Sequence, residues 1–329
     1  MKPPLSRSRI ALAAIISLCI CSPVLGDESL QREVEANVPN GPLRGTLLAP
    51  PGNASNASVV IVPGSGPTDR NGNNPLGATS GYLQGLAEAL AGAGIASIRI
   101  DKRGMFASAG TFGDPNAVAF DDYAADALAW VTVARDEAGT DCSWLLGHSE
   151  GALVSLLAAA KSSDELCGLV LLAAPGRKMG AVLREQLRAN PHNQPLLADA
   201  EAAIDGLERG EHIDASDFHP AAQQLFAPAL QDFLIDAFSR DPAALIAGLN
   251  LPVLIVQGDN DLQVKTEDAE ALARAQPEAE LLVMPGMNHV LKTTPPGDMQ
   301  ANLAAYADPS LPLADGLAEL VAEFVRRKR

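Results

Sequence analysis

Short apolar runs alternate with stretches of helical periodicity along most of the chain. The apolar runs are typical of buried strands and occur at residues 58–62, 95–100, 142–146, 168–174, 251–258 and 280–284. Helical spacing of apolar residues lies between them, at residues 82–93, 117–138, 152–160, 266–275 and 315–327. A hairpin is expected before them, at residues 33–48. Strands that alternate with helices in this way predict an α/β fold, with a mostly parallel central sheet flanked by helices.

This alternation stops between residues 177 and 249. The stretch is rich in Ala, Leu, Gln and charged residues with helical spacing, and prolines interrupt it repeatedly. It predicts three to five helices and no strand, inserted between two strands of the sheet. We therefore expect a core domain formed by residues 27–176 and 250–329, and a helical cap insertion at residues 177–249 that lies over the pocket and chooses substrates.

One motif stands where a predicted strand meets a predicted helix: Gly147-His148-Ser149-Glu150-Gly151. The flanking runs leave only a very tight turn, with Ser149 at its apex. Such a turn lifts the central side chain clear of the sheet, and the start of the helix offers N–H groups to a negative charge beside it. Gly147 and Gly151 suit the close approach of helix and strand, because neither has a Cβ atom. The motif predicts a nucleophilic hydroxyl on Ser149.

This Gly-x-Ser-x-Gly turn resembles the nucleophile elbow of the α/β-hydrolases, with the matching strand and helix on either side. The resemblance implies an α/β-hydrolase fold in which a nucleophile, an acid and a histidine follow one another along the chain, each after a strand. Ser149, Asp261 and His289 obey that order. Because the ends of parallel strands meet at one edge of a sheet, we expect the three side chains to converge there.

The histidine of this set has one candidate after the insertion, whereas the acid has two candidate aspartates. His289 is the last histidine of the chain. The family pattern Gly-x-x-Asp-x-x-Val matches residues 258–264 around Asp261, which favours Asp261. Asp259 is the alternative acid, and is otherwise expected to cap the turn. His148 is expected to pack beside the elbow.

A Gly-rich segment follows the strand predicted at residues 58–62. It reads Pro63-Gly64-Ser65-Gly66-Pro67-Thr68-Asp69-Arg70-Asn71-Gly72, and it resembles a branch of bacterial serine esterases that also has aminopeptidase-like and thioesterase-like members. Many α/β-hydrolases carry His-Gly-x at this strand end, and the backbone N–H of x points at the developing oxyanion. Here Pro63 replaces the histidine, and Ser65 takes the position of x. The resemblance implies an oxyanion hole formed by the backbone N–H groups of Ser65 and Glu150.

Two further segments are expected near the pocket. The sequence Asp101-Lys102-Arg103-Gly104 resembles the Asp-x-Arg-Gly turn of this fold. We expect Asp101 and Arg103 to form a buried charge pair that holds loops near the site. The Gly-rich stretch at residues 105–116 is expected to form part of the pocket wall.

Composition narrows the classes of partner. The chain has 329 residues, of which 47% are hydrophobic, and its formal net charge is −16. It can therefore bury a large core, and it lacks the clustered Lys and Arg that nucleic acid binding needs. His192, His212 and His219 show no metal-ligand spacing. We expect a small-molecule substrate and no nucleic acid, metal or cofactor, and the sequence leaves the oligomeric state open.

Residues 1–26 have the pattern of a secretory signal peptide. Basic residues precede an apolar stretch from Ile10 to Ile20 that is too short to span a bilayer. Val24-Leu25-Gly26 then offers small residues at the positions before a cut. We expect cleavage after Gly26, and a secreted or periplasmic protein with no stable membrane insertion after cleavage. An uncleaved N-terminal anchor is the alternative.

Cys142 and Cys167 are the cysteines that remain after such cleavage. Each stands just before an apolar run, and in a parallel sheet of this type the two runs would be neighbouring strands, with both cysteines at one edge. A disulfide is therefore expected in an oxidising compartment. Two buried free thiols are the alternative.

Together these features predict an exported serine hydrolase that cleaves carboxylic esters, with small or short acyl groups, through an acyl-enzyme intermediate. The same three side chains could act on amides or thioesters, as in an aminopeptidase or an acyl-transfer enzyme, since leaving-group preference resides in the cap and in the 105–116 loop. A binding protein that kept the fold without the chemistry is a further alternative, and the complete set of Ser149, Asp261 and His289 disfavours it.

Overall fold

The structure is a computed structural model, and it describes residues 30–53, 55, 57–111 and 117–327. The predicted signal peptide, residues 1–26, lies outside the described residues. Among the described residues, no helix combines the length and the apolar character needed to cross a bilayer.

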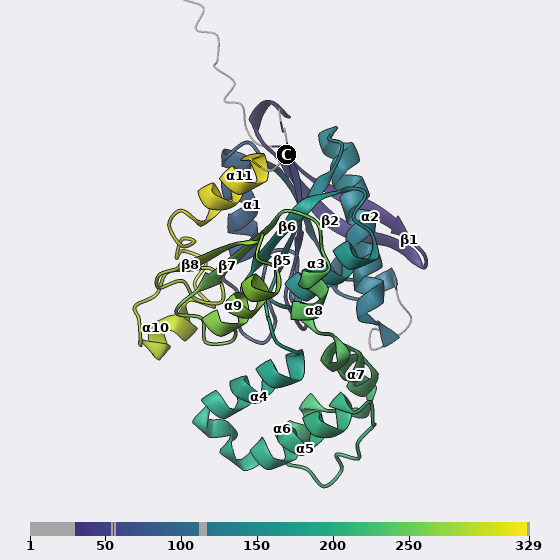
Figure 1. Cartoon of the computed structure of the whole chain (residues 1–329), viewed down its shortest axis with the longest axis vertical. Helices are drawn as coiled ribbons and strands as arrows, with labels where there is room; N and C mark the ends of the chain where they lie inside the picture. Colours follow the sequence, from purple (N-terminus) through teal and green to yellow (C-terminus); the bar gives the residue numbers. More distant parts are fainter. Residues whose placement is uncertain (1–29, 54, 56, 112–116, 328–329) are drawn as a thin grey trace, which may run out of the picture.

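The described residues form one eight-stranded sheet with the strand order β1-β2-β4-β3-β5-β6-β7-β8 (Figure 1). The antiparallel hairpin β1–β2 pairs through β2 with β4, and all pairings from β4 to β8 are parallel. This arrangement confirms the predicted α/β class. The strands are β1 (Leu30–Val38), β2 (Gly41–Ala49), β3 (Ser58–Val62), β4 (Ala96–Ile100), β5 (Ser143–His148), β6 (Leu166–Leu172), β7 (Val253–Gly258) and β8 (Glu280–Met284).

Helices cover both faces of the sheet (Figure 1). Alternate residues of β3 show why: Val59 and Ile61 pack in the core cluster under α1 and α11, whereas Val60 and Val62 pack in the cluster under α2, α3 and α9. A strand that is buried on both faces is largely apolar, as the run of residues 59–62 in β3 is. The helices are α1 (Tyr82–Gly92), α2 (Phe120–Ala138), α3 (Glu150–Lys161), α9 (Thr266–Ala275) and α11 (Leu317–Arg327).

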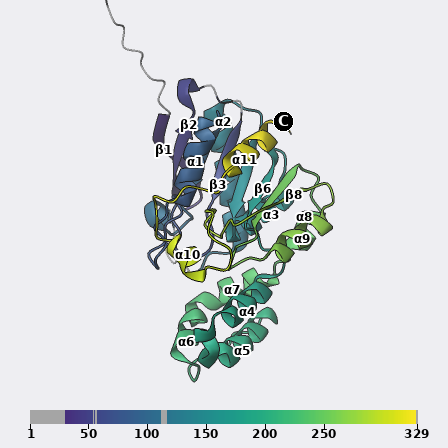
Figure 2. The same ribbon diagram turned by 90° about the vertical axis from the view of Figure 1, so that its left-hand side faces the viewer.

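The segment between β6 and β7 is helical, and its described residues contain no strand. The chain enters it from the carboxyl end of β6, and the helices α4–α7 form a group beyond that end of the sheet (Figure 1; Figure 2). Phe233 of α7 stacks on Phe120 at the start of α2, with ring centroids 5.0 Å apart, and Arg177 pairs with Asp268 of α9. The helices are α4 (Met179–Ala189), α5 (Leu197–Glu208), α6 (Pro220–Leu225), α7 (Gln231–Ser239) and α8 (Pro242–Ala247).

A short helix that the apolar pattern did not predict, α10 (Met299–Ala304), follows β8. The Asp298 side chain caps it by accepting from the N–H of Ala301 (2.9 Å). Short 3-10 turns complete the described secondary structure: η1 (Pro51–Asn53), η2 (Phe106–Thr111), η4 (Pro191–Leu196) and η5 (Pro228–Leu230).

The strand order reverses between β3 and β5. After β3 the chain adds β4 on one side, and it then returns to place β5 on the other side of β3. In open α/β sheets the crevice at the carboxyl ends of two such strands is the usual place for a ligand. The segment with Ser65 follows β3, and Ser149 follows β5, so both predicted site segments begin at this crevice.

Candidate active site

Ser149 occupies the sharp turn between β5 and α3. Its backbone angles are φ 54° and ψ −122°, and a positive φ is uncommon and strained for a non-glycine residue. The Ser149 N–H donates to the carbonyl of Leu172 at the end of β6 (2.9 Å), which ties the turn to the next strand. Both flanking glycines are required for packing. A Cβ on Gly147 would lie 2.3 Å from the carbonyl oxygen of Gly151, and one on Gly151 would lie 2.3 Å from that of Val62.

Ser149 lines a cavity of about 360 Å³ at the carboxyl ends of β3 and β5. His289 lines the same cavity, together with Gly64 and Ser65 from the segment after β3. The fold therefore gathers the predicted nucleophile, the predicted base and one predicted oxyanion segment in one place. Among the described residues, the His289 ring makes a hydrogen bond to Asp261 and none to the Ser149 hydroxyl.

A buried carboxylate holds the His289 ring. Nδ1 of His289 lies 2.8 Å from Oδ2 of Asp261. Oδ1 of Asp261 accepts from the N–H groups of Gln263 (2.7 Å) and Val264 (3.0 Å), and the Gln257 amide donates to Oδ2 (3.2 Å). Burial raises the pKa of Asp261, but His289 and these backbone N–H groups outweigh it, so the pKa lies below its ordinary value. A charged Asp261 fixes the hydrogen of His289 on Nδ1 and leaves Nε2 as the basic nitrogen.

Asp259, the alternative acid, has a different partner. Its Oδ1 accepts from the backbone N–H of Gly286 (2.6 Å), which anchors the loop that leads from β8 to His289. Of the two aspartates, Asp261 makes the hydrogen bond to the imidazole of His289. The contacts therefore favour Asp261 as the acid and give Asp259 a turn-holding role.

His148 packs beside the elbow, against the rings of Tyr82 and His289. Its buried ring packs on the His289 ring, with centroids 4.8 Å apart. Nε2 of His148 lies 2.8 Å from the backbone carbonyl of His289, and Nδ1 lies 3.1 Å from the hydroxyl of Tyr82. A carbonyl only accepts, so Nε2 carries the hydrogen and Nδ1 accepts from Tyr82. Burial and the nearby His289 lower the pKa of His148 to about 3, which keeps the ring neutral.

A buried ion pair connects the two segments that carry the predicted oxyanion donors. Nζ of Lys102, just after β4, donates to the carbonyl of Gly64 (2.8 Å) and to Oε1 of Glu150 (3.0 Å). Both charged side chains are buried. The carbonyl of Gly64 and the N–H of Ser65 belong to one planar trans peptide, so they point in opposite directions. Lys102 thus sets the direction of the Ser65 N–H by holding the other side of the same peptide.

The predicted pairing of Asp101 with Arg103 is wrong. Asp101 accepts instead from Nε (3.0 Å), Nη2 (2.8 Å) and the backbone N–H (2.9 Å) of Arg70. Arg103 pairs with Asp126 of α2, through Nε at 2.6 Å. Each pair joins a loop at a strand end to another element, and the Arg70 pair anchors the segment that continues from Ser65.

The walls of the cavity come mainly from the loop after β3, the loop with His289, and α10 with the residues that follow it. Its other lining residues are Thr68, Gly72, Asn74, Leu76, Gly77, Ala78, Tyr82, His148, Gln263, Val290, Leu303 and Tyr306. Residues 105–111, the described part of the predicted wall, are absent from this lining, and Phe106 and Ala107 border another hollow beside Arg99. The predicted wall is therefore wrong for the described residues. The helical insertion, residues 177–249, likewise supplies none of the described lining.

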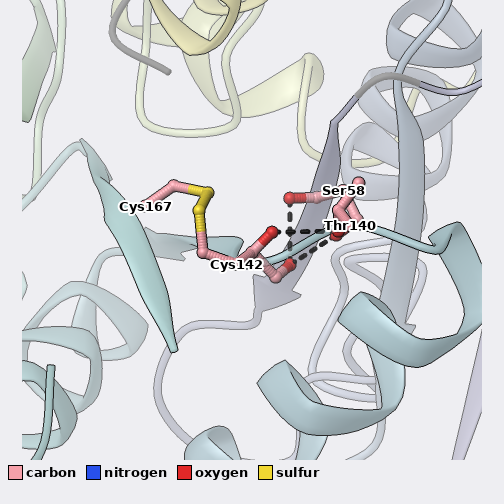
Figure 3. Close-up of a disulfide and its surroundings, with 5 residues drawn as sticks. Ser58, Thr140, Cys142 and Cys167 are labelled. Carbon is pink, nitrogen blue, oxygen red and sulfur yellow. Dashed lines mark hydrogen bonds between the residues drawn. A yellow bond between two sulfur atoms is a disulfide. The ribbon is translucent and has the colours of Figure 1, made fainter. Parts of the chain in front are cut away.

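A disulfide joins Cys142 and Cys167, whose Cα atoms are 5.2 Å apart (Figure 3). Cys142 directly precedes β5, and Cys167 is the second residue of β6. The bridge lies at the amino ends of these strands, whereas Ser149 follows the carboxyl end of β5. It therefore crosslinks the sheet away from the cavity.

This fold and this arrangement of side chains define an α/β-hydrolase. The sheet is mostly parallel, a serine occupies the β5–α3 turn, and a histidine–aspartate pair follows β8 and β7. Residues 74–293 match the family described as serine aminopeptidase, S33. The chain belongs to this family.

Two curated relatives are similar in sequence. Esterase EstD of Thermotoga maritima is 28% identical over an alignment of 265 residues, and the match covers 77% of this chain and 60% of the relative. Lipase 3 of a Moraxella species is 25% identical over an alignment of 172 residues, and the match covers 49% of this chain and 55% of the relative. The matches thus span little more than half the length of either relative.

Solved structures agree on the fold. Est1E of Butyrivibrio proteoclasticus, with ferulic acid bound, superposes with a TM-score of 0.56 at 21% identity, covering 89% of this chain and 96% of that one. The esterase PF2001 of Pyrococcus furiosus gives a TM-score of 0.55 at 18% identity and covers 91% of both chains. At this level of identity the likeness concerns the fold.

Proposed function

We propose that the protein is an exported serine hydrolase that cleaves carboxylic esters through an acyl-enzyme intermediate, and that it acts on esters with small or short acyl groups. The observation that carries the proposal is the 2.8 Å contact of Asp261 with His289, whose ring lines the same cavity as Ser149. A serine hydroxyl is a weak nucleophile at neutral pH, and an imidazole held by a carboxylate is a group that activates it. The relatives named esterase and lipase support this bond type.

In the proposed acylation step, Nε2 of His289 takes the hydroxyl proton of Ser149 while Oγ attacks the ester carbonyl. Catalytic hydrogen bonds are often long in unliganded enzymes, and substrate binding brings the two side chains into contact. Asp261 stays ionised and stabilises the imidazolium that forms. His289 then protonates the departing alkoxide, so that the alcohol leaves and the acyl group stays on Ser149.

Backbone N–H groups of Ser65 and Glu150 are the proposed donors to the tetrahedral oxyanion. Each such donor contributes on the order of 3 kcal/mol to lowering the barrier. Lys102 is the proposed positioning residue for both, because its ammonium binds the Gly64 carbonyl and the Glu150 side chain. A chain of polarised hydrogen bonds through the Gly64–Ser65 peptide also strengthens the N–H as a donor.

Deacylation repeats the proton transfers with water in place of the hydroxyl. His289 takes a proton from water as the water oxygen attacks the acyl carbon, and it returns that proton to Oγ of Ser149 when the carboxylic acid leaves. The enzyme is restored with the proton again on the serine.

The direct test is hydrolysis of p-nitrophenyl acetate by Ser149→Ala. The proposal predicts that turnover falls to the background of the buffer while circular dichroism stays native. Ser163→Ala, an exposed serine beyond the end of α3, is the matched control and is expected to keep wild-type turnover. Wild-type turnover by Ser149→Ala would refute the proposed nucleophile.

Export is the second part of the proposal. It is supported by the signal-like pattern of residues 1–26 and by the disulfide of Cys142 and Cys167, a bond that persists in oxidising compartments. N-terminal sequencing of the protein recovered outside the cytoplasm tests it. Asp27 as the first residue is expected, and an intact Met1 would contradict cleavage.

A further inference from the structure

We propose that the cavity beside Ser149 takes an uncharged, apolar acyl group, and that Leu76 and Leu303 are the residues that select it. The inference rests on the proposed ester hydrolysis, because it names the class of ester that the same site accepts. It locates substrate selection in the loop after β3 and in α10.

The described wall of the cavity offers no partner for a charged substrate. The described wall contains two imidazoles, those of His289 and of the neutral His148. This described wall contains no ammonium, guanidinium or carboxylate group. Asp261 lies behind the His289 ring, and its oxygens accept from His289, Gln263 and Val264. An ammonium or carboxylate on the acyl group would therefore lose hydration without gaining a counter-charge, which is strongly unfavourable.

Polar side chains in the wall are largely engaged with the protein itself. The Gln263 amide donates to the Tyr306 hydroxyl (2.9 Å), and the Thr68 hydroxyl donates to the carbonyl of Ser65 (2.9 Å). The Tyr82 hydroxyl donates to Nδ1 of His148. Since these groups already have partners, a polar acyl chain gains few hydrogen bonds in exchange for those it makes with water.

Two leucines of the wall are left open to solvent. Leu76 is 87% exposed and Leu303 is 57% exposed, and both line the cavity. Large apolar side chains gathered at one cavity are typical of a ligand-binding surface. Covering them with an apolar chain removes their surface from water together with that of the chain.

Hydrogen bonds hold these leucines in place. Leu76 lies at the tip of a closed turn, in which the N–H of Asn74 donates to the carbonyl of Ala78 (2.6 Å) and the Asn74 side chain accepts from the N–H of Leu76 (2.8 Å). Thr79 then donates its N–H to the carbonyl of Tyr306, just after α10 (2.8 Å). The turn and α10 are thus linked directly, and a preformed apolar wall costs little to order when substrate binds.

The size of the cavity limits the length of the acyl group that it can hold. A volume of about 360 Å³ is near the lower end of the range for ligand pockets, roughly 300–1,000 Å³. Each methylene that the wall covers should raise kcat/KM by about fourfold, which corresponds to about 0.8 kcal/mol. Activity is therefore expected to rise from acetate to a short or medium acyl chain and then to fall when the chain outgrows the cavity.

The test measures kcat/KM of the purified protein on p-nitrophenyl acetate, butyrate and hexanoate, for wild type and for Leu76→Gln/Leu303→Gln. The ratio of kcat/KM for hexanoate to that for acetate should fall about fifteenfold in the double variant, as the loss of contacts to about two methylenes would give. Leu225→Gln is the matched control, because Leu225 of α6 is an exposed leucine outside the cavity lining. It should keep the wild-type ratio.

Charge is tested with p-nitrophenyl hemisuccinate and with alanine p-nitrophenyl ester, compared with the butyrate ester. Both charged substrates should be at least 100-fold slower in kcat/KM. Equal or faster turnover of either one, an unchanged hexanoate-to-acetate ratio in the double variant, or an equal loss in Leu225→Gln would overturn this inference while leaving ester hydrolysis intact. A failure of the proposed function itself would look different. Either the wild-type protein would hydrolyse none of these esters, or Ser149→Ala would still hydrolyse them.

Discussion

Nε2 of His148 lies 2.8 Å from the backbone carbonyl of His289, a residue 141 positions later in the chain. The residue directly before the proposed nucleophile therefore holds the main chain of the proposed base. Tyr82 completes the arrangement by donating to the other ring nitrogen. Because burial lowers the pKa of His148 to about 3, this link between the two loops is made by a neutral ring at physiological pH.

Stability should fall in acid because of His148. In the unfolded chain its imidazole takes up a proton near its ordinary pKa of 6.5, whereas in the folded protein it does so only near pH 3. Between these values the unfolded state binds more protons, so lowering the pH favours unfolding by up to about 1.4 kcal/mol per pH unit. Urea unfolding between pH 7 and pH 4 should show this slope in wild type and a shallower one in His148→Gln. Parallel slopes would show that His148 is not the group responsible.

Asp261 and Asp259 should respond differently to the same substitution. Asp261→Asn removes the charge that stabilises the imidazolium and favours the wrong tautomer of His289, so kcat should fall by about 10³ to 10⁴. Asp259→Asn affects a contact to the backbone of Gly286 and should lower kcat less than tenfold. Steady-state kinetics on p-nitrophenyl acetate compares them. A larger loss in Asp259→Asn would reverse the assignment of the acid.

Lys102 should affect turnover more than substrate binding. Lys102→Met frees the Gly64 carbonyl, so that the Ser65 N–H is no longer held toward the oxyanion, and kcat should fall about 10-fold to 100-fold with little change in KM. The variant also leaves Glu150 as a buried unpaired charge, which costs about 3–5 kcal/mol of stability.

A double variant separates these two effects. Lys102→Met/Glu150→Gln leaves no unpaired charge, so urea unfolding should show that stability is largely regained while kcat stays low. Lys161→Met, at an exposed ion pair, is the control and should change neither quantity. Wild-type kcat in the double variant would rule out a positioning role for Lys102.

The disulfide should stabilise the sheet without contributing to catalysis. It closes a loop with a sequence separation of 25, so Cys142→Ser/Cys167→Ser should lower the free energy of unfolding by about 3 kcal/mol. Since the bridge lies at the far end of β5 from Ser149, kcat at 25 °C should stay within about twofold of wild type. Reductant should shift the urea midpoint of wild type and leave that of the variant unchanged. The same shift in both would mean that reductant acts elsewhere.

The part of the site that follows from local sequence could be predicted. The two glycines around Ser149 are dictated by close approach of the helix to β3 and β5, and this constraint is visible as a short motif. The positions of Asp261 and His289 follow from strand ends that meet at one edge, so chain order was enough to bring them together. The observed bounds of β3, Ser58–Val62, match the predicted strand because a strand buried on both faces shows as a nearly continuous apolar run.

Contacts that depend on how loops pack could not be predicted. Asp101 and Arg103 belong to one short turn, but in the folded chain Asp101 pairs with Arg70 and Arg103 pairs with Asp126. The helix α10 is too short to show a period, and its one local signal is the capping Asp298. It nevertheless brings Leu303 to the cavity. The wall expected from the 105–116 loop was wrong in its described part because η2 packs beside β2 and borders another hollow.

The proposed catalysis depends most on Ser149 being the group that the His289–Asp261 pair activates, and covalent labelling measures this directly. Treatment of the purified protein with a fluorophosphonate, followed by peptide mass spectrometry, should give one adduct, on the peptide that contains Ser149. His289→Ala should be labelled at least 100-fold more slowly, and Ser149→Ala should not be labelled. An adduct on another residue, or labelling of Ser149 at the wild-type rate without His289, would contradict the activation of Ser149 by the His289–Asp261 pair.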